Sequence, residues 1–249
     1  MEAYTGFAEV YDIFMDNVPY EQWSRFLVEL LHSYGVEDGL VCELGCGTGK
    51  MTELLSEAGF DMIGIDASYE MLSIAQRSRT SDRDILYLCQ DMREMELYGT
   101  VEAVVSVCDS MNYLLSEEDL FTTFSLVNNY LDPGGLFIFD MNTEYKYREL
   151  LGERTICENR EMCSFIWENY YDRQERMNEY DLTLFVKEQD DLFRKFEEIH
   201  YQRSYSIETV RELLEKSGME VVDIMDATTH KEVKEDSERV YFIAREIMK

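Results

Sequence analysis

The stretch from Leu40 to Asp66, LVCELGCGTGKMTELLSEAGFDMIGID, places the strongest constraint on what this chain can fold into. Its first five residues are mostly apolar and predict a short strand that is covered on both faces. A glycine-rich turn at 45–49 follows, where glycine can take positive φ and lets a ligand approach the backbone closely. Apolar residues then recur at helical spacing up to Gly59, and a second apolar strand ends at Asp66. A complete strand–turn–helix–strand unit is therefore predicted here.

Three nucleotide-binding patterns compete for the glycine turn. A phosphate-binding P-loop, G-x-x-x-x-G-K-[ST], fails because Leu44 stands at its first glycine and Met51 at its hydroxyl position. The dinucleotide fingerprint G-x-G-x-x-G is weakened, though not excluded, because Lys50 replaces its third glycine. The third pattern, E-x-G-x-G-x-G with an acid at the end of the next strand, fits residues 43–49 and Asp66 in full.

This third pattern resembles motif I of the class I S-adenosylmethionine-dependent methyltransferases. In that family the glycine turn lies against the methionyl and ribose part of the cofactor, and the acid after the second strand binds the ribose hydroxyls. A carboxylate such as Asp66 suits this task, since it can accept hydrogen bonds from two neighbouring hydroxyls. The alternative, a turn that is rich in glycine by chance, is disfavoured because turn, helix, strand and acid all occur in register. The resemblance implies S-adenosylmethionine as cofactor and S-adenosylhomocysteine as product.

The alternation of strands and helices continues after Asp66. Apolar runs predict further strands over 85–89, 103–107, 136–139, 221–225 and 240–244. The turn Asp132-Pro133-Gly134-Gly135 is another mark of the same family, and its proline and glycines fix the backbone angles of a turn. We therefore expect an α/β fold, a Rossmann-like seven-stranded and mostly parallel sheet with helices on both faces, whose final hairpin carries an antiparallel strand.

Residues 153–205 break this alternation and predict a small antiparallel β insertion after the fifth strand. Its strand-like stretches lie at 163–167, 180–186 and 193–201. Residues 1–152 and 206–249 then form the cofactor-binding core, with N-terminal helices within 1–37. Several small-molecule N-methyltransferases, which the whole chain resembles, cover their cleft with an insertion at this place. A lid over the cleft and an oligomerisation sheet both remain open interpretations.

The resemblance also implies which residues meet the cofactor. An N-terminal segment of the type Y-x-x-FA-x-x-YD, here Tyr4 to Asp12, closes over the cofactor in related enzymes, so Tyr11, Tyr4 or both are expected in the cleft; a packing helix is the alternative. Asp91 is expected to accept from the adenine amino group, with a solvated turn acid as its alternative, and the backbone N–H of Met92 to reach a ring nitrogen. The residues implied for the cofactor are Tyr11, Glu43, Gly45, Cys46, Gly47, Gly49, Asp66, Ala67, Met71, Gln90, Asp91, Met92, Cys108 and Asp109.

The substrate is expected beside the loops after the first and fourth strands, because ligands of open α/β sheets bind where the strand order reverses. The residues expected on the substrate side are Asn112, Tyr113, Asn142 and Trp167. The reaction implied is in-line displacement at a sulfonium methyl, which depends on orientation and exclusion of water. A general base is needed only for a protonated acceptor. No catalytic residue is assigned: His200, Asp140 and Tyr113 are candidates, and packing within the fold is the alternative for His200.

Composition limits the partners. The net charge is −29, from 23 basic and 52 acidic residues, which repels nucleic acid and anionic membranes. The six cysteines form no CxxC pair, so reduced, buried cysteines are expected rather than zinc or disulfides. No signal peptide opens the chain, and no apolar run approaches the ~18 residues of a membrane span. We expect a cytoplasmic monomer or homodimer that acts on a small molecule and holds no metal.

Two alternatives belong to other functional classes. An NAD(P)-dependent oxidoreductase could use the same topology, although Lys50 and the Pro-Gly-Gly turn at 133–135 disfavour it. A non-catalytic partner protein could have kept the cofactor fold, and an intact glycine turn with Asp66 and Asp91 indicates cofactor binding rather than turnover. The sequence does not name the methyl acceptor.

Overall fold

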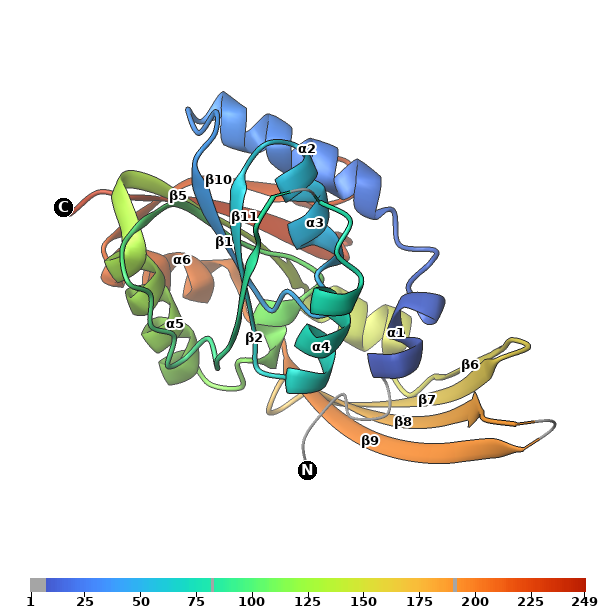
Figure 1. Ribbon diagram of the computed structural model, residues 1–249. Helices are drawn as coiled ribbons and strands as arrows, with labels where there is room; N and C mark the ends of the chain where they lie inside the picture. The colour runs from blue at the N-terminus through green and yellow to red at the C-terminus, as the bar shows by residue number, and fades with distance from the viewer. Residues whose placement is uncertain (1–7, 82, 190–191) are drawn as a thin grey trace.

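The chain folds into a large sheet with helices on both faces and a separate antiparallel sheet beside it (Figure 1). The structure is a computed structural model and describes residues 8–81, 83–189 and 192–249. The large sheet is seven-stranded, with the order β10-β11-β5-β4-β1-β2-β3. Its strands are β1 (Leu40–Leu44), β2 (Asp61–Asp66), β3 (Leu86–Cys89), β4 (Val101–Ser106), β5 (Leu131–Asn142), β10 (Met219–Asp226) and β11 (Arg239–Glu246).

Strand direction follows the expected pattern. The strands β1 to β5 pair in parallel, whereas β11 is antiparallel to both of its neighbours, β5 and β10. The order reverses between β1 and β4, so the carboxyl ends of these two strands border the crevice in which such sheets bind ligands. The seven-stranded, mostly parallel sheet with an antiparallel final hairpin is confirmed.

Helices cover the two faces of this sheet in separate groups (Figure 1). On one face, buried residues of α2 and α3 pack with the sheet, and on the other those of α5 and α6 do so. The serines Ser68, Ser116 and Ser206 cap α4, α5 and α6, each accepting from a backbone N–H in the first turn. The helices are α1 (Ala8–Phe14), α2 (Tyr20–Ser33), α3 (Lys50–Glu57), α4 (Tyr69–Arg77), α5 (Glu117–Tyr130) and α6 (Ile207–Lys216), with a 3-10 helix η1 (Ser110–Tyr113) and a π-helix η2 (Lys146–Leu151).

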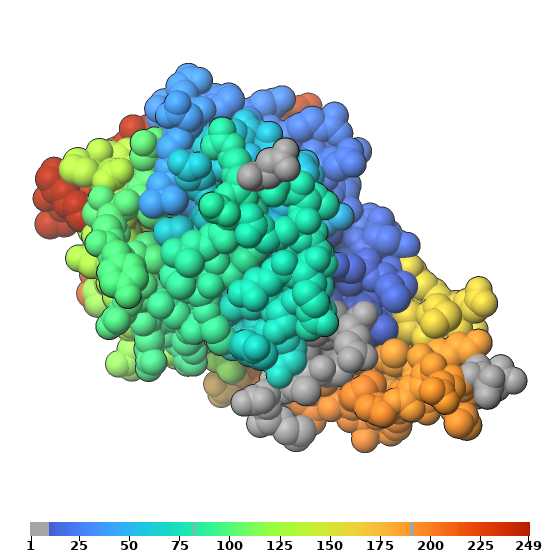
Figure 2. Space-filling view, in the orientation of Figure 1, coloured from blue at the N-terminus to red at the C-terminus, as the bar shows by residue number. Residues whose placement is uncertain are grey.

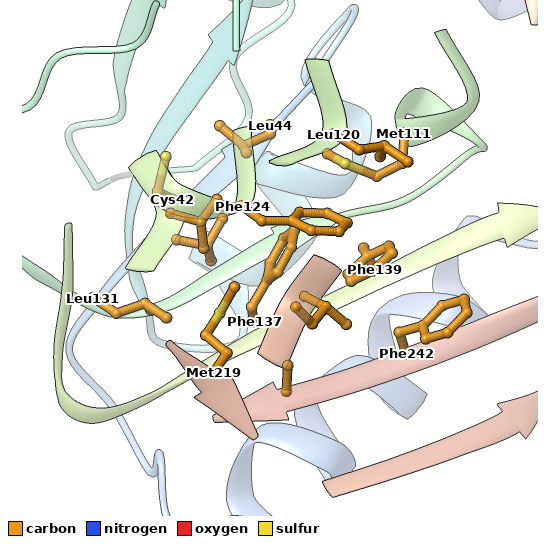
Figure 3. Packing of buried hydrophobic residues seen from close by; sticks show 14 of the residues in the cluster. Cys42, Leu44, Met111, Leu120, Phe124, Leu131, Phe137, Phe139, Met219 and Phe242 are labelled. Carbon is orange, nitrogen blue, oxygen red and sulfur yellow. The ribbon is translucent and has the colours of Figure 1, made fainter. Parts of the chain in front are cut away.

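The core on the α5–α6 face is strongly aromatic (Figure 3). Phe137 and Phe139 of β5 stack at 4.5 Å between ring centroids, and Phe139 stacks on Phe242 of β11 at 5.1 Å. Phe124 of α5 lies over both β5 rings. Aromatic pairs of this kind stabilise beyond their buried area. The central strands are therefore a rigid base for the loops at their ends.

The inserted sheet has four strands in the order β6-β7-β8-β9, all antiparallel. Its strands are β6 (Thr155–Asn159), β7 (Cys163–Asp172), β8 (Met177–Lys187) and β9 (Phe193–Arg203). The sequence predicted three strand-like stretches here. The strand β6 was not predicted, because its sequence TICEN is short and partly polar; in the structure its residues are mostly exposed. Figure 2 shows the insertion projecting from the core, with α1 beside it. Val10 and Phe14 of α1 pack on its inner face, and Phe14 meets Phe165 edge-on at 4.7 Å.

Several smaller expectations differ from the structure. The fifth strand begins at Leu131, ahead of the predicted turn at 132–135, and runs to Asn142. The six cysteines are all free thiols, but Cys89 and Cys157 are exposed rather than buried. Tyr4 lies outside the described residues. No helix in the described part of the chain is long and apolar enough to cross a membrane.

Candidate active site

A cavity of about 1370 Å³ runs from the carboxyl ends of the central strands to the inner face of the inserted sheet. Single small-molecule sites usually measure ~300–1,000 Å³, so this one has room for two molecules side by side. Its core wall includes every residue predicted for the cofactor except Gly49. Three of the residues predicted for the substrate line it, namely Tyr113, Asn142 and Trp167, and so does His200. Asn112 and Asp140 do not.

Asp66 closes the glycine turn from the neighbouring strand. Its Oδ2 accepts from the backbone N–H of Gly47 at 2.8 Å, and its Oδ1 accepts from that of Ser68 at 2.8 Å. Burial raises the pKa of this carboxyl group, while the two backbone hydrogen bonds oppose the rise. Each oxygen keeps a second lone pair, and the residue lines the cavity. The carboxylate is therefore held in a fixed orientation where a ligand hydroxyl could reach it.

The absence of a side chain at Gly45 permits a close contact with the turn after β4. It has a φ of +69°, and a Cβ at this position would lie 2.5 Å from Oγ and 2.6 Å from Cβ of Ser110 in η1. The turn after β1 and the turn after β4 thereby touch directly, which draws together the two loops that flank the crevice. At Gly47 the φ is +54°, but a Cβ would meet nothing within 4 Å.

We expect Gly45→Ala to destabilise the protein by about 2–4 kcal/mol, because a left-handed backbone strain of about 1–2 kcal/mol adds to the overlap with Ser110. Gly47→Ala, the matched control, should cost only the strain. Urea unfolding of the two variants without ligand measures this difference. Equal destabilisation would show that the contact with Ser110 is not what requires a glycine at position 45.

Gly49 serves packing, contrary to the prediction that it meets the cofactor. It does not line the cavity, and its φ of +79° caps the start of α3. A Cβ here would lie 2.5 Å from the hydroxyl of Tyr87 and 2.9 Å from Ala75. The glycine therefore lets α3 approach β3 and α4. A motif read from sequence cannot separate a glycine that faces a ligand from one that faces another helix.

Glu43 is almost completely buried beneath the turn, and the hydroxyl of Thr52 donates to its Oε2. Burial raises the pKa of Glu43 to about 8; the Thr52 hydrogen bond opposes this rise and the charge of Asp66 adds to it. The folded protein therefore keeps a proton on Glu43 at neutral pH. The sequence predicted a cofactor-binding role for this residue, and its contacts also give it a structural one.

The sign of the Glu43 effect on stability follows from this shift. Because the pKa in the fold lies above its ordinary value of 4.5, stability should fall as the pH rises from about 5 to 8, by up to ~1.4 kcal/mol per pH unit. Glu43→Gln cannot ionise, so its unfolding free energy should fall less steeply over that range. Urea unfolding at several pH values tests this, and an identical pH slope in both proteins would contradict the assignment.

The loop after β3 is held by its own side chains. Arg93 pairs with Asp91 at 2.5 Å, and hydrogen bonding to this guanidinium lowers the pKa of Asp91. The side chain of Gln90 bonds to the backbone of Glu96, its Oε1 accepting from N at 2.9 Å. Met92 lines the cavity next to them. Asp91 is therefore ionised and oriented, whereas Gln90 uses its amide within the loop, so its backbone and aliphatic part are what the cavity can meet.

The turn after β4 is fixed by buried charges. Cys108 and Asp109 both have positive φ, and their backbone N–H groups donate to Asp140 at 3.1 and 2.7 Å. Arg239 of β11 pairs with Asp140 at 3.0 Å and with Asp109. Burial raises the pKa of Asp140, although Arg239 counteracts this. Asp140 is fully buried, so the prediction of a possible base at this position is wrong: its carboxylate holds the turn.

Asn112 also has a structural role, contrary to the prediction that it faces the substrate. Its side chain is fully buried: Oδ1 accepts from the backbone N–H of Asn142 at 2.8 Å, and Nδ2 donates to the carbonyls of Asn142 and Arg203 at 3.2 and 2.8 Å. It therefore ties η1 to β5 and to the end of β9. The sequence placed Asn112 in the right loop but could not give the direction of its side chain.

The far wall of the cavity is the inner face of the inserted sheet. Trp167 and Tyr180 pack together there, with ring centroids 5.1 Å apart, and Phe165 lies beside them on β7. His200 lies on β9, with Nε2 3.1 Å from Oε2 of Glu198, and meets the ring of Tyr113 edge-on at 6.1 Å. This wall is mostly aromatic and faces the glycine turn across the cavity.

Several lining residues were missed by the sequence analysis: Tyr20, Lys146, Tyr180, Gln202 and Arg239. Lys146 of η2 donates to Oδ1 of Asn142 at 3.0 Å, and burial lowers its pKa. None of these residues belongs to a motif, and the partners of Arg239 stand 99 and 130 positions away. Within the described ranges no group of three or more His, Cys, Asp or Glu side chains could hold a metal ion.

Comparison with known proteins agrees with this geometry. Residues 41–135 match a family model described as a methyltransferase domain. The chain is 37% identical to YqeM of Bacillus subtilis (strain 168), whose methyltransferase name is provisional, over 97% of this chain and 96% of that protein. It also matches the crystal structure of an S-adenosylmethionine-dependent methyltransferase from Clostridium acetobutylicum, with a TM-score of 0.88, 28% identity and coverage of 99% and 100%.

A more distant match is the dTDP-3-amino-3,4,6-trideoxy-alpha-D-glucopyranose N,N-dimethyltransferase of Streptomyces venezuelae, 30% identical over 53% of this chain and 56% of that one. The fold, the glycine turn and the acid at the end of β2 define a nucleotide-binding α/β enzyme. The chain belongs to the class I methyltransferases that use S-adenosylmethionine. This membership decides against the oxidoreductase and non-catalytic alternatives.

Proposed function

We propose that the protein transfers the methyl group of S-adenosylmethionine to a small organic acceptor that lies against the inner face of the inserted sheet. The observation that carries the proposal is the continuous cavity, which joins the glycine turn to the aromatic wall of Phe165, Trp167 and Tyr180. The cofactor fits the core side, where the turn offers backbone without side chains and Asp66 offers oriented oxygens. The aromatic side is then left for the acceptor.

The residues around this second half suit a displacement reaction. When bound, S-adenosylmethionine supplies an electrophilic methyl group on a sulfonium. The protein has to orient the acceptor and exclude water, and aromatic walls do both. His200 stays a candidate base for an acceptor that must lose a proton, because Glu198 orients its ring and Tyr113 packs against it. We propose that residues 153–205 form a separate subdomain, which supplies the wall against which the acceptor lies.

We further propose an amine as the acceptor. The relative from Streptomyces venezuelae is named for methylation of an amino sugar, which supports this class. The net charge of −29 argues against nucleic acid as substrate. The free thiols fit a reducing compartment, so we propose a cytoplasmic location. We also propose that the protein is a monomer or a homodimer.

The test is formation of S-adenosylhomocysteine with a panel of small amines, with transfer RNA and a basic protein as competing substrates. An amine should be turned over, and Trp167→Ala should raise its KM at least about tenfold while the Kd of S-adenosylhomocysteine stays the same. Phe185→Ala is the matched control, because Phe185 alternates to the outer face of the same sheet. Methylation of the RNA or the protein alone would contradict the proposal.

A further inference from the structure

Gln202 joins the inserted sheet to the turn that follows β4. Its side chain is buried, and its Oε1 accepts from the hydroxyls of Tyr147 at 2.9 Å and Tyr180 at 2.5 Å. Its Nε2 donates to Oδ2 of Asp109 at 2.7 Å. One amide thereby connects η2, β8 and β9 with a residue on the core wall of the cavity.

The residue after Gln202 strengthens the same junction. The carbonyl of Arg203 accepts from Nδ2 of Asn112 at 2.8 Å, and its guanidinium donates from Nη1 to the carbonyl of Leu115 at 2.9 Å. Two consecutive residues of β9 are thus bonded to the short segment 109–115. The far ends of β8 and β9 lie away from this junction and project from the core (Figure 1). The sheet is therefore anchored at one end, next to the cavity.

Asp109 carries the core side of this junction. It stands at positive φ, lines the cavity, and shares its carboxylate between Gln202 and Arg239. A ligand that bound against this turn would therefore meet a residue that also holds the amide of Gln202. Buried hydrogen bonds to a charged group are among the stronger ones, so the link transmits a constraint rather than a loose contact.

We propose that Gln202 is a positioning residue that couples cofactor binding on the core to ordering of the acceptor wall on the inserted sheet. The proposal rests on the proposed function, in that the cofactor lies beside Asp109 and the acceptor beside Tyr180. Tyr180 is both a donor to Gln202 and part of the aromatic wall. Cofactor binding therefore sets the wall before the acceptor arrives, and by linkage an acceptor tightens cofactor binding by the same factor.

Hydrogen–deuterium exchange with S-adenosylhomocysteine tests this directly. In the unaltered protein the ligand should slow exchange in the turn at 107–113 and also in the strands β8 and β9. In Gln202→Met, which keeps the length of the side chain and removes its hydrogen bonds, the slowing in the two strands should disappear while that in the turn remains.

Two further variants separate coupling from a general loss of stability. Asn178 is a buried polar residue on β8, opposite Gln202, and its side chain donates a hydrogen bond to Asn169 within the inserted sheet. In Asn178→Leu the slowing of exchange in β8 and β9 should therefore persist. Gln202→Glu keeps the oxygens that accept from the tyrosines and places a charge against Asp109, so it should behave like Gln202→Met.

Two results would overturn the coupling. Slowing confined to the turn in the unaltered protein would show that the strands do not respond, and full slowing of the strands in Gln202→Met would show that they respond without Gln202. Both differ from failure of the proposed function, in which the ligand would leave the turn itself unchanged in the unaltered protein.

Discussion

Asp66→Ala is expected to weaken binding of S-adenosylhomocysteine at least roughly 100-fold. The variant removes a carboxylate that the backbone N–H groups of Gly47 and Ser68 hold in place at the cavity wall. Two hydrogen bonds from ribose hydroxyls to a charged group are worth about 3–6 kcal/mol together, and about 1.4 kcal/mol is tenfold in Kd. The same change removes the hydrogen bond that the backbone N–H of Gly47 donates to β2. Calorimetric titration measures the effect.

Asp61→Ala is the matched control for this prediction. Asp61 begins the same strand, is exposed and pairs with Arg83 at 3.1 Å, so its loss should leave the Kd unchanged. Asp66→Asn should be intermediate, because it keeps one oxygen that can accept. An unchanged affinity in Asp66→Ala, with folding intact, would show that the cofactor does not use this acid.

Of the substitutions considered, Arg239→Met is expected to lower the free energy of unfolding the most. The guanidinium is buried between Asp109 and Asp140, and although burial lowers its pKa, the attraction of these carboxylates raises it well above the ordinary value. Removing the cation leaves the buried Asp140 and the half-buried Asp109 facing each other without their partner, and breaking a buried ion pair in this way costs about 3–5 kcal/mol. Urea unfolding should show this loss.

The loss in Arg239→Met should also depend on pH. Without Arg239, the already raised pKa of Asp140 rises further, so the variant should lose more stability than the unaltered protein as the pH rises above the ordinary pKa of an aspartate. Arg245→Met on the same strand is the control: its Nη2 donates to the carbonyl of Tyr34 at 3.0 Å, and its loss should cost about 1 kcal/mol. An equal loss of unfolding free energy in the two variants would show that the ion pairs of Arg239 with Asp109 and Asp140 add no stability beyond an ordinary hydrogen bond.

The parts of the structure that the sequence predicted well are those whose causes are local. The strands β1 and β2 are mostly apolar, and the turn between β1 and α3 is rich in glycine. Each of these features depends on neighbours within a few positions, so a pattern can identify it.

The parts that the sequence did not predict depend on residues far apart in the chain. Asp140 was a candidate catalytic residue, but its side chain accepts from the backbone N–H groups of the turn after β4, the strand that pairs with its own. Gln202 and Asp109 are 93 positions apart, and no local pattern marks either. The exposed edge strand β6 lacks the apolar alternation that identifies strands. The roles predicted for individual cofactor residues stay predictions.

Calorimetric titration of the unaltered protein with S-adenosylhomocysteine, with NADH as the parallel control, tests whether the cavity binds the methyltransferase cofactor. We expect saturable binding of about one S-adenosylhomocysteine per chain with a Kd in the micromolar range, and no heat with NADH. Tight binding of NADH without a response to S-adenosylhomocysteine would contradict this expectation.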